Sequence, residues 1–243
     1  MTGRELPPSS PFAGDDGTAD ETVAAALAGY GAGSATLRTV VAALEGTRVL
    51  VPVLAELEVG ELVVHDGHAH QVDKEASAGI VALRAPDGRT ALPVFSSVGA
   101  MTAWRRDARP VPTDVARAAL SAVQEGWEVL VLDPGGPVTA LLPRPAVWAL
   151  AKREPWLPAV VDGAVAADVR AAVGSAMSTV REVVVADAQP GTNAEVAVVV
   201  TLVPGLDRER LDHVVARINS ALAADELVTE RVDSLELRLR RGA

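Results

Sequence analysis

Three histidines within six residues form the group in this chain that is best suited to bind a metal ion. His65, His68 and His70 lie in the segment HDGHAH, close to Asp66 and Asp73. Neutral imidazole is a common ligand of zinc and nickel in proteins, so these side chains are a candidate metal site. A structural zinc site usually has a fourth ligand in fixed geometry, and this run lies in a polar, irregular stretch. We therefore prefer the interpretation of a solvated surface loop, with opportunistic metal binding as the alternative.

Two adjacent serines, Ser96 and Ser97, are the candidates for nucleophilic or ligand-binding chemistry. Serine catalysis needs a base that is oriented by a carboxylate, and the chain contains no G-x-S-x-G turn. The two serines precede a short helix that carries Trp104, and a serine in this place is typically the helix N-cap. A helix N-terminus also attracts anions. We keep Ser96 and Ser97 as a candidate site for a small anionic ligand, and we assign no catalytic residue.

The glycine pair Gly135-Gly136 does not indicate a nucleotide site. A phosphate-binding loop has Lys followed by Ser or Thr after its glycines, and here Pro137 follows instead. The run Asp133-Pro134-Gly135-Gly136-Pro137 is typical of a tight turn between two strands. The sequence therefore predicts no cofactor.

The last strand of the chain and one tryptophan are the candidate surfaces for a protein partner. In residues 234–240 leucines alternate strictly with charged residues. This pattern predicts a half-exposed strand, and an exposed strand edge can pair with another chain. Trp104 and Arg105 form a second candidate, because these residue types are enriched where interfaces bind most tightly. We assign Trp104, Arg105 and Leu237 to partner binding.

The overall charge argues against two classes of partner. The 243 residues carry a formal net charge of −10, from 22 basic and 32 acidic side chains. Such a chain is repelled by nucleic acid and by anionic membrane surfaces. It lacks the run of about 18 uncharged apolar residues that a spanning helix requires, and the absence of cysteine fits a reducing compartment. We expect a cytoplasmic protein that binds another protein, a homodimer being one such arrangement.

Residues 12–151 are predicted to form one α+β domain, after a disordered tail at residues 1–11. Helices and paired strands in separate runs are typical of this fold class. Two prolines, Pro110 and Pro112, are expected to end the helix around Trp104, and Thr113 to cap the next helix. The expected helices cover residues 21–30, 35–44, 113–125 and 143–151, and the expected strands 47–54, 79–84, 89–95, 127–132 and 138–142.

Residues 164–243 are predicted to form a second α+β domain, after a linker at residues 152–163 that contains two prolines. Its expected order is helix, strand, strand, helix, strand. Apolar residues of the second helix fall on one stripe, which indicates a helix that packs on a sheet. Each domain is thus expected to hold a small mixed or antiparallel sheet with helices on one face. The expected elements cover residues 164–177, 180–187, 195–202, 207–222 and 234–240.

Several of these segments resemble one protein family. Residues 87–97, DGRTALPVFSS, resemble the hallmark of the SseB family, usually written PVFTS, with Ser96 where threonine is usual. The spacing onward to Trp104 and to the turn at residues 133–137 resembles the N-terminal domain of that family. Residues 180–241 are similar to its C-terminal domain, and the stretches at residues 12–17 and 48–53 resemble its actinobacterial members.

The resemblance implies a fold more than an activity. The family name means enhanced serine sensitivity, which describes a phenotype, and no established catalytic site comes with it. We therefore expect a non-enzymatic cytoplasmic interaction or regulatory module. The alternative is a small anionic-ligand binder, or an enzyme, that uses the helix start at Ser96-Ser97.

Overall fold

The computed structural model describes residues 12–54, 81–85 and 88–242. By its internal contacts the chain divides into two compact units. The first unit holds the described residues up to Pro143 together with Val147–Pro155, and the second holds Arg144–Ala146 and the residues from Trp156 onward. The expected tail at residues 1–11 and the histidines His65, His68 and His70 lie outside the described residues. Helices and small mixed sheets confirm the α+β prediction.

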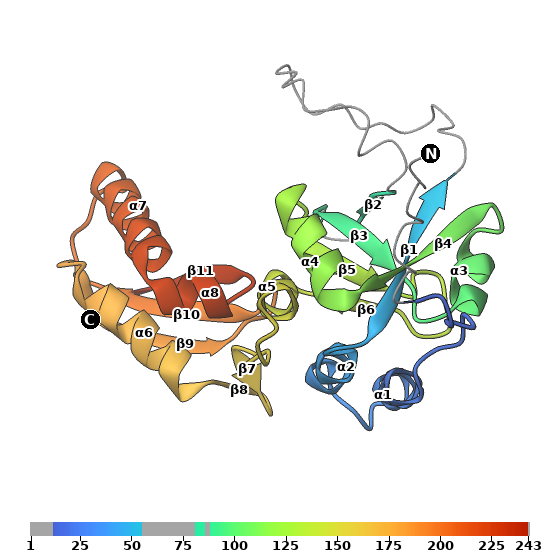
Figure 1. Ribbon diagram of the computed structural model, residues 1–243. Coiled ribbons are helices and arrows are strands. Elements are labelled where there is room, and N and C mark those ends of the chain that lie inside the picture. The colour runs from blue at the N-terminus through green and yellow to red at the C-terminus, as the bar shows by residue number, and fades with distance from the viewer. Residues whose placement is uncertain (1–11, 55–80, 86–87, 243) are drawn as a thin grey trace, which may run out of the picture. The chain divides into compact units, whose positions relative to one another are not determined.

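The first unit is built on a mixed sheet of four strands in the order β2-β3-β5-β6. Only the central pair, β3 and β5, is parallel (Figure 1). A separate antiparallel pair, β1 and β4, is joined to this sheet by a bridge between Leu50 and Phe95. The elements are α1 (Glu21–Gly31), α2 (Leu37–Leu44), β1 (Arg48–Leu54), β2 (Leu83–Arg84), β3 (Thr90–Val94), α3 (Val98–Trp104), β4 (Ala108–Asp114), α4 (Val115–Gln124), β5 (Val129–Leu132) and β6 (Ala140–Leu142), together with α5 (Arg144–Lys152) from Val147 onward, since its first residues belong to the second unit.

Strand β4 corrects the sequence prediction for residues 108–114. The two prolines there were expected only to end the helix around Trp104, which already ends at Trp104, and the segment instead pairs with β1 over seven residues. Pro110 lies opposite Pro52, and Pro112 lies opposite Leu50. Proline lacks an N–H but is tolerated on the edge strands of a sheet, and a two-stranded sheet has only edge strands. The cap of α4 is accordingly Asp114, whose carboxylate accepts the backbone N–H of Ala116 at 3.0 Å, and not Thr113.

The second unit has a three-stranded sheet in the order β11-β10-β9 (Figure 1). Strand β10 is antiparallel to β9 and parallel to β11. Helix α8 follows α7 directly, and the sequence analysis missed it because its six residues are too few to show an apolar period. The elements are β7 (Val160–Val161), β8 (Ala164–Val165), α6 (Ala167–Ser178), β9 (Val183–Pro190), β10 (Val196–Leu202), α7 (Arg208–Ala224), α8 (Glu226–Arg231) and β11 (Leu235–Arg241).

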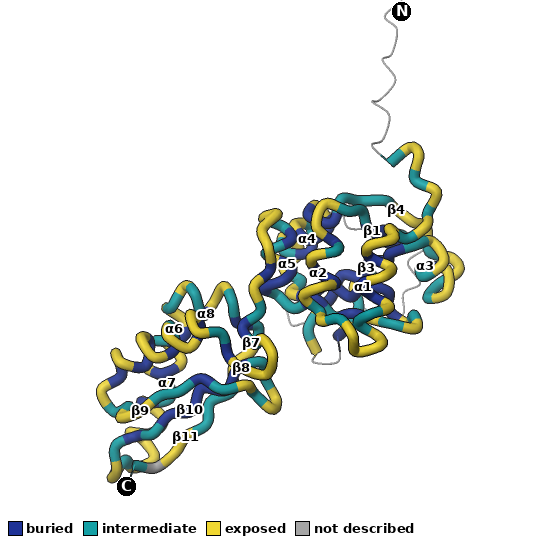
Figure 2. The backbone as a smooth tube through the Cα atoms, turned by 90° about the horizontal axis from the view of Figure 1, so that it is seen from below, coloured by how far each residue is buried: buried dark blue, intermediate teal, exposed yellow. Residues whose placement is uncertain are grey.

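The core of the second unit lies between its helices and one face of its sheet. Strand β10 is buried along nearly its whole length, and Figure 2 shows it between β9 and β11. Its residues Val196, Val198 and Val200 pack in one cluster with Ile218 and Leu222 of α7. The predicted apolar stripe of α7 is therefore its buried face. None of the described helices has both the length and the apolar character that crossing a bilayer requires.

Candidate functional site

Ser96 and Asp133 meet at the carboxyl ends of the two parallel strands. Ser96 lies just beyond β3 and Asp133 just beyond β5, and parallel strands end at the same edge of a sheet. The Ser96 backbone N–H donates to Asp133 Oδ1 at 2.8 Å, and the Ser96 hydroxyl donates to Oδ2 at 2.6 Å. Both carboxylate oxygens are therefore engaged by a single residue.

The Asp133 carboxyl is buried, which disfavours its ionised form. The residue is only 7% exposed, and burial raises its pKa although the two hydrogen bonds from Ser96 oppose that shift. Its backbone φ of 51° lies in the left-handed region, where Asp is tolerated better than most residues. The Asp133 carbonyl accepts the Thr139 hydroxyl at 2.9 Å, which closes the turn between β5 and β6. Asp133 thus fastens this turn to the end of β3.

An ion pair between Arg48 and Asp15 fastens a second loop to the same place. Arg48 Nε and Nη2 donate to the two Asp15 oxygens at 2.6 and 2.9 Å. The Arg48 guanidinium also donates to the carbonyls of Ser96 and Thr18. The side chains of Arg48 and Asp15 are only 14% and 13% exposed, and the hydrogen bond from Arg48 lowers the Asp15 pKa. The loop before α1 is thereby held against β1 and the β3–α3 turn.

The second serine and the tryptophan of this region also have structural partners. Ser97 Oγ accepts the Ala100 N–H at 3.1 Å, which confirms that a serine caps helix α3. The Trp104 ring lies 5.3 Å from the Phe95 ring, centroid to centroid, and packs on the core around Phe95. Arg105 donates to both carboxylate oxygens of Asp107, at 3.0 and 2.8 Å.

Ser96 and Asp133 place a hydroxyl beside a carboxylate, as a catalytic pair does, but both residues are buried. A carboxylate beside a serine hydroxyl is able to take its proton, yet Ser96 is only 7% exposed and a substrate must reach the hydroxyl. The Ser97 hydroxyl oxygen already accepts a hydrogen bond from the backbone of helix α3. Within the part of the chain that the structure describes, no three His, Cys, Asp or Glu residues are grouped as metal ligands. Binding of a small anion by Ser96 and Ser97 stays a prediction, as does metal binding by His65, His68 and His70.

Strand β11 forms one edge of the second unit's sheet, so only one of its two sides pairs with β10. The Ser234 carbonyl accepts the Val196 N–H at 3.2 Å, and the Gly242 N–H donates to the Leu202 carbonyl at 3.0 Å. Residues of a strand turn their backbone groups alternately to its two sides, so these even-numbered positions face β10. The backbone groups of Leu235, Leu237 and Leu239 therefore face outward. Among the described residues no strand pairs with that side.

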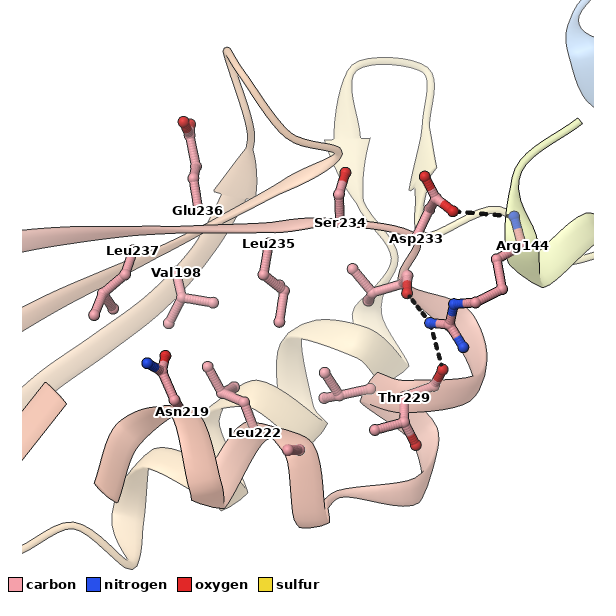
Figure 3. Close-up of a pocket in the computed structure, with 13 residues that line it drawn as sticks. Arg144, Val198, Asn219, Leu222, Thr229, Asp233, Ser234, Leu235, Glu236 and Leu237 are labelled. Carbon is pink, nitrogen blue, oxygen red and sulfur yellow. Dashed lines mark hydrogen bonds between the residues drawn. The ribbon is translucent and has the colours of Figure 1, made fainter. Parts of the chain in front are cut away.

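A groove runs beside this edge, between β11 and helices α7 and α8. Leu235 and Leu237 point into it toward Leu222, while Glu236 points to the other face of the strand (Figure 3). Leu235 and Leu239 are 39% and 42% exposed, although they lie on the same face of the strand as Leu237. The outer edge of β11 therefore combines outward-facing backbone groups with incompletely covered leucines.

Three residues hold the start of β11 in place. The backbone N–H of Arg144 donates to Asp233 Oδ1 at 3.0 Å, and Arg144 Nη2 donates to the carbonyls of Thr229 and Val232 at 2.8 Å each (Figure 3). The carboxylate of Glu195 accepts the Asp233 N–H at 2.8 Å, and burial raises the Glu195 pKa. These hydrogen bonds fix the position of the residues that lead into β11.

Sequence reasoning missed Asp133, Arg144 and the groove. A lone carboxylate directly after the buried run VLVL was a usable signal for Asp133, because a charge at the end of such a strand needs a partner. Arg144 contacts residues more than 80 positions away, and no local pattern announces such contacts. Leu237 was assigned to partner binding; the structure places it at the edge strand, and its role stays a prediction, as do those of Trp104 and Arg105.

Comparison with known proteins gives one match. The family model of the SseB protein N-terminal domain matches residues 21–149, more than half of the chain. The match includes the cluster around Ser96 and Asp133 and ends before β11. No curated protein and no solved structure matches the chain.

Proposed function

The chain belongs to the SseB family, and from that premise we propose that it is a non-enzymatic interaction module that binds an extended polypeptide segment at the outer edge of β11. The partner strand pairs with the outward backbone groups of Leu235, Leu237 and Leu239, and its alternate side chains enter the groove toward α7. We place this interaction in the cytoplasm as part of the same proposal.

The observation that carries the proposal is the regularity of the β11 edge. Strand β11 keeps one register with β10 over seven residues, and it contains neither proline nor glycine. Proteins commonly protect an exposed edge by a bulge, a proline or a covering loop. Within the described parts of the chain, strand β11 lacks these three devices and lies beside a groove lined in part by leucines, so it is suited to accept a strand whose charges complement its own Glu236 and Arg238.

The other edge of the same sheet, β9, is less suited to accept a strand. Its register with β10 shifts at Thr201 and Leu202, it ends at Pro190, and β8 contacts it. Val184 and Val185 on β9 are well exposed, at 60% and 58%. They lie where the register with β10 shifts, so the row of backbone donors and acceptors is interrupted there, and β9 is a good control for β11.

The alternative function, anion binding or catalysis at Ser96-Ser97, receives less support. The Ser96 hydroxyl and backbone N–H are both committed to Asp133, and the carboxylate adds negative charge where an anion would bind. Ser97 Oγ is committed to Ala100.

Matched substitutions on the two edges test the proposal. Immobilised full-length protein is exposed to native lysate, and the retained polypeptides are identified by mass spectrometry. Leu239→Lys places a charge on the β11 edge, and Val185→Lys places the same charge on β9. We expect a polypeptide retained in stoichiometric amount by the unaltered chain and by Val185→Lys, and lost with Leu239→Lys. Equal retention by both variants, or retention of nothing by an unaltered chain that is itself monomeric, would contradict the proposal.

A further inference from the structure

We infer that the segment that binds β11 is β11 of a second copy of this chain, antiparallel to the first, with the two-fold axis at Leu237. This inference rests on the proposed function, because it names the partner of the same edge. It is carried by three properties of the seven residues of β11 (LELRLRR): the direction of the backbone groups, the order of charges and the position of the leucines.

The backbone directions restrict how two copies can pair. In an antiparallel pair, residues whose N–H and C=O face the partner lie directly opposite one another and exchange both bonds. The outward residues of β11 are Leu235, Leu237 and Leu239, as the bonds of Ser234 and Gly242 to β10 establish. An outward leucine must therefore lie opposite an outward residue of the second copy. The symmetric registers that meet this condition near the middle of β11 have their axis at residue 236, 237 or 238.

The order of charges selects one of these three registers. An axis at Glu236 sets two carboxylates opposite each other, and an axis at Arg238 does the same with two guanidinium groups; directly opposed like charges destabilise a strand pair. An axis at Leu237 sets Glu236 opposite Arg238 of the second copy, twice. Charges on edge strands usually oppose pairing, but here their spacing makes the strand complementary to itself.

The same register also pairs the incompletely covered leucines. With the axis at Leu237, Leu235 of one copy lies opposite Leu239 of the other, and the two copies of Leu237 face each other. Leu235 and Leu239 are the exposed leucines of this strand. Leu237 and Leu235 line the groove beside α7, so the second copy closes the groove with its own leucines.

On the open face of the sheet, the charges form a small network. Within one copy Arg238 already donates to the carboxylate of Glu236 and to Thr192 Oγ1, the latter at 2.7 Å. Glu236 also accepts the Thr192 N–H at 2.9 Å. In the dimer, Glu236 and Arg238 of both copies lie side by side, so that each carboxylate has a guanidinium group of the other copy opposite it. Because the axis is perpendicular to the sheet, the helices of both copies cover the same face and leave this network on the other.

Single cysteines test the register directly, because the chain has no cysteine of its own. Directly opposed residues of this type have Cα atoms about 5.5 Å apart, within the range that a disulfide spans. Under mild oxidation we expect Leu237→Cys to crosslink with itself, whereas Leu235→Cys and Leu239→Cys crosslink when mixed but not separately. A crosslink between Leu237→Cys and Leu239→Cys, equal crosslinking of every combination, or none at all would overturn the register.

Charge variants test the association without crosslinking, by analytical ultracentrifugation of the full-length protein. Glu236→Arg and Arg238→Glu each turn two attractive pairs into repulsive ones, so each should weaken self-association about 10-fold or more. When mixed, the two variants regain two attractive pairs, and we expect a heterodimer about as stable as the unaltered dimer. Variants that dimerise separately as well as the unaltered chain would contradict the inference.

The outcomes separate this inference from the proposed function. If the unaltered chain is monomeric at high concentration, yet a different polypeptide is captured and is lost with Leu239→Lys, the second copy is wrong and the binding edge stands. If the chain is monomeric and Leu239→Lys changes no capture, both fail.

Discussion

The two regions built from short motifs of this sequence use their polar groups in opposite ways. At the β3–α3 turn of the first unit, Ser96 and Asp133 satisfy each other inside the protein, and Arg48 holds Asp15. At β11 of the second unit, the outward backbone groups have no strand beside them within the described residues, and the leucines next to them are partly exposed. The polar groups of the first region are satisfied inside the protein, whereas those at the outer side of β11 face outward.

This difference separates what identifies the family from what we propose it does. The segment with the most distinctive sequence, around Phe95-Ser96-Ser97, lies within the matched family domain and serves the fold. The segment with the plainest pattern, an alternating strand, lies beyond that match and carries the proposed binding surface. A distinctive motif is therefore not evidence of a reaction until its polar atoms prove accessible. The following substitutions test whether the two regions really differ in this way.

The largest loss of stability is expected from Phe95→Ala. Phe95 is fully buried, contacts Trp104 and joins β1 to the end of β3. Removing a buried phenylalanine side chain costs about 3–5 kcal/mol. Denaturant unfolding of the full-length protein measures the change. A loss below about 1 kcal/mol would show that the region is not the closed core that the comparison requires.

A smaller loss is expected from Asp133→Ala, about 2–3 kcal/mol, because two buried donors of Ser96 lose their acceptor. Asp133→Asn keeps an acceptor and tolerates the left-handed backbone, so it is the matched control and should cost less.

The pH dependence of the same pair gives a second readout. Burial raises the Asp133 pKa above its ordinary value of 3.8. The contribution of this carboxyl to stability is therefore fully present below pH 3.8 and is lost as the pH rises through the folded-state pKa. Asp133→Asn should remove that loss. Identical pH profiles for the two proteins between pH 3 and 7 would show that Asp133 is not buried as described.

Arg48→Lys should cost about 1–2 kcal/mol of stability, because lysine cannot donate to both oxygens of Asp15 while it also reaches the Ser96 carbonyl.

The pH dependence of the stabilisation by Asp15 has the opposite sign to that of Asp133. Arg48 lowers the Asp15 pKa below 3.8, so the stabilisation is present above pH 3.8 and is lost as the pH falls through the lower folded-state value. Acid unfolding curves of Arg48→Lys and the unaltered protein should converge at low pH; a constant difference would contradict the ion pair.

The smallest change in stability is expected from Leu239→Lys, within about 0.5 kcal/mol, because the side chain is 42% exposed. Its effect on self-association should nevertheless be the largest among the substitutions described above. Phe95→Ala should leave association unchanged at temperatures where the protein stays folded. If Phe95→Ala weakened self-association and Leu239→Lys did not, the proposed difference between the buried region around Phe95 and the strand edge at β11 would be wrong.

Much of the fold was predictable from local patterns, and the pairing of distant segments was not. The apolar stripe of α7 and the alternation in β11 depend on residues close together in the sequence, and both were confirmed. The strand Ala108–Asp114 was missed because its prolines disfavour a strand locally, and only its pairing with β1 explains it. In the same way Ser97 was predictable as a cap, whereas the Ser96–Asp133 contact depends on two strands that lie side by side only in the folded chain.

The most direct test of the account is residue-level amide hydrogen exchange along β11, measured by NMR at low and at high protein concentration. The amides of Glu236 and Arg238 face β10 and should be protected at both concentrations, as should the Ser96 amide that Asp133 accepts. We predict that the amides of Leu237 and Leu239 exchange fast in the dilute protein and become protected as the concentration rises. Unchanged, fast exchange of these two amides at high concentration would contradict pairing of β11 with a second copy of the chain.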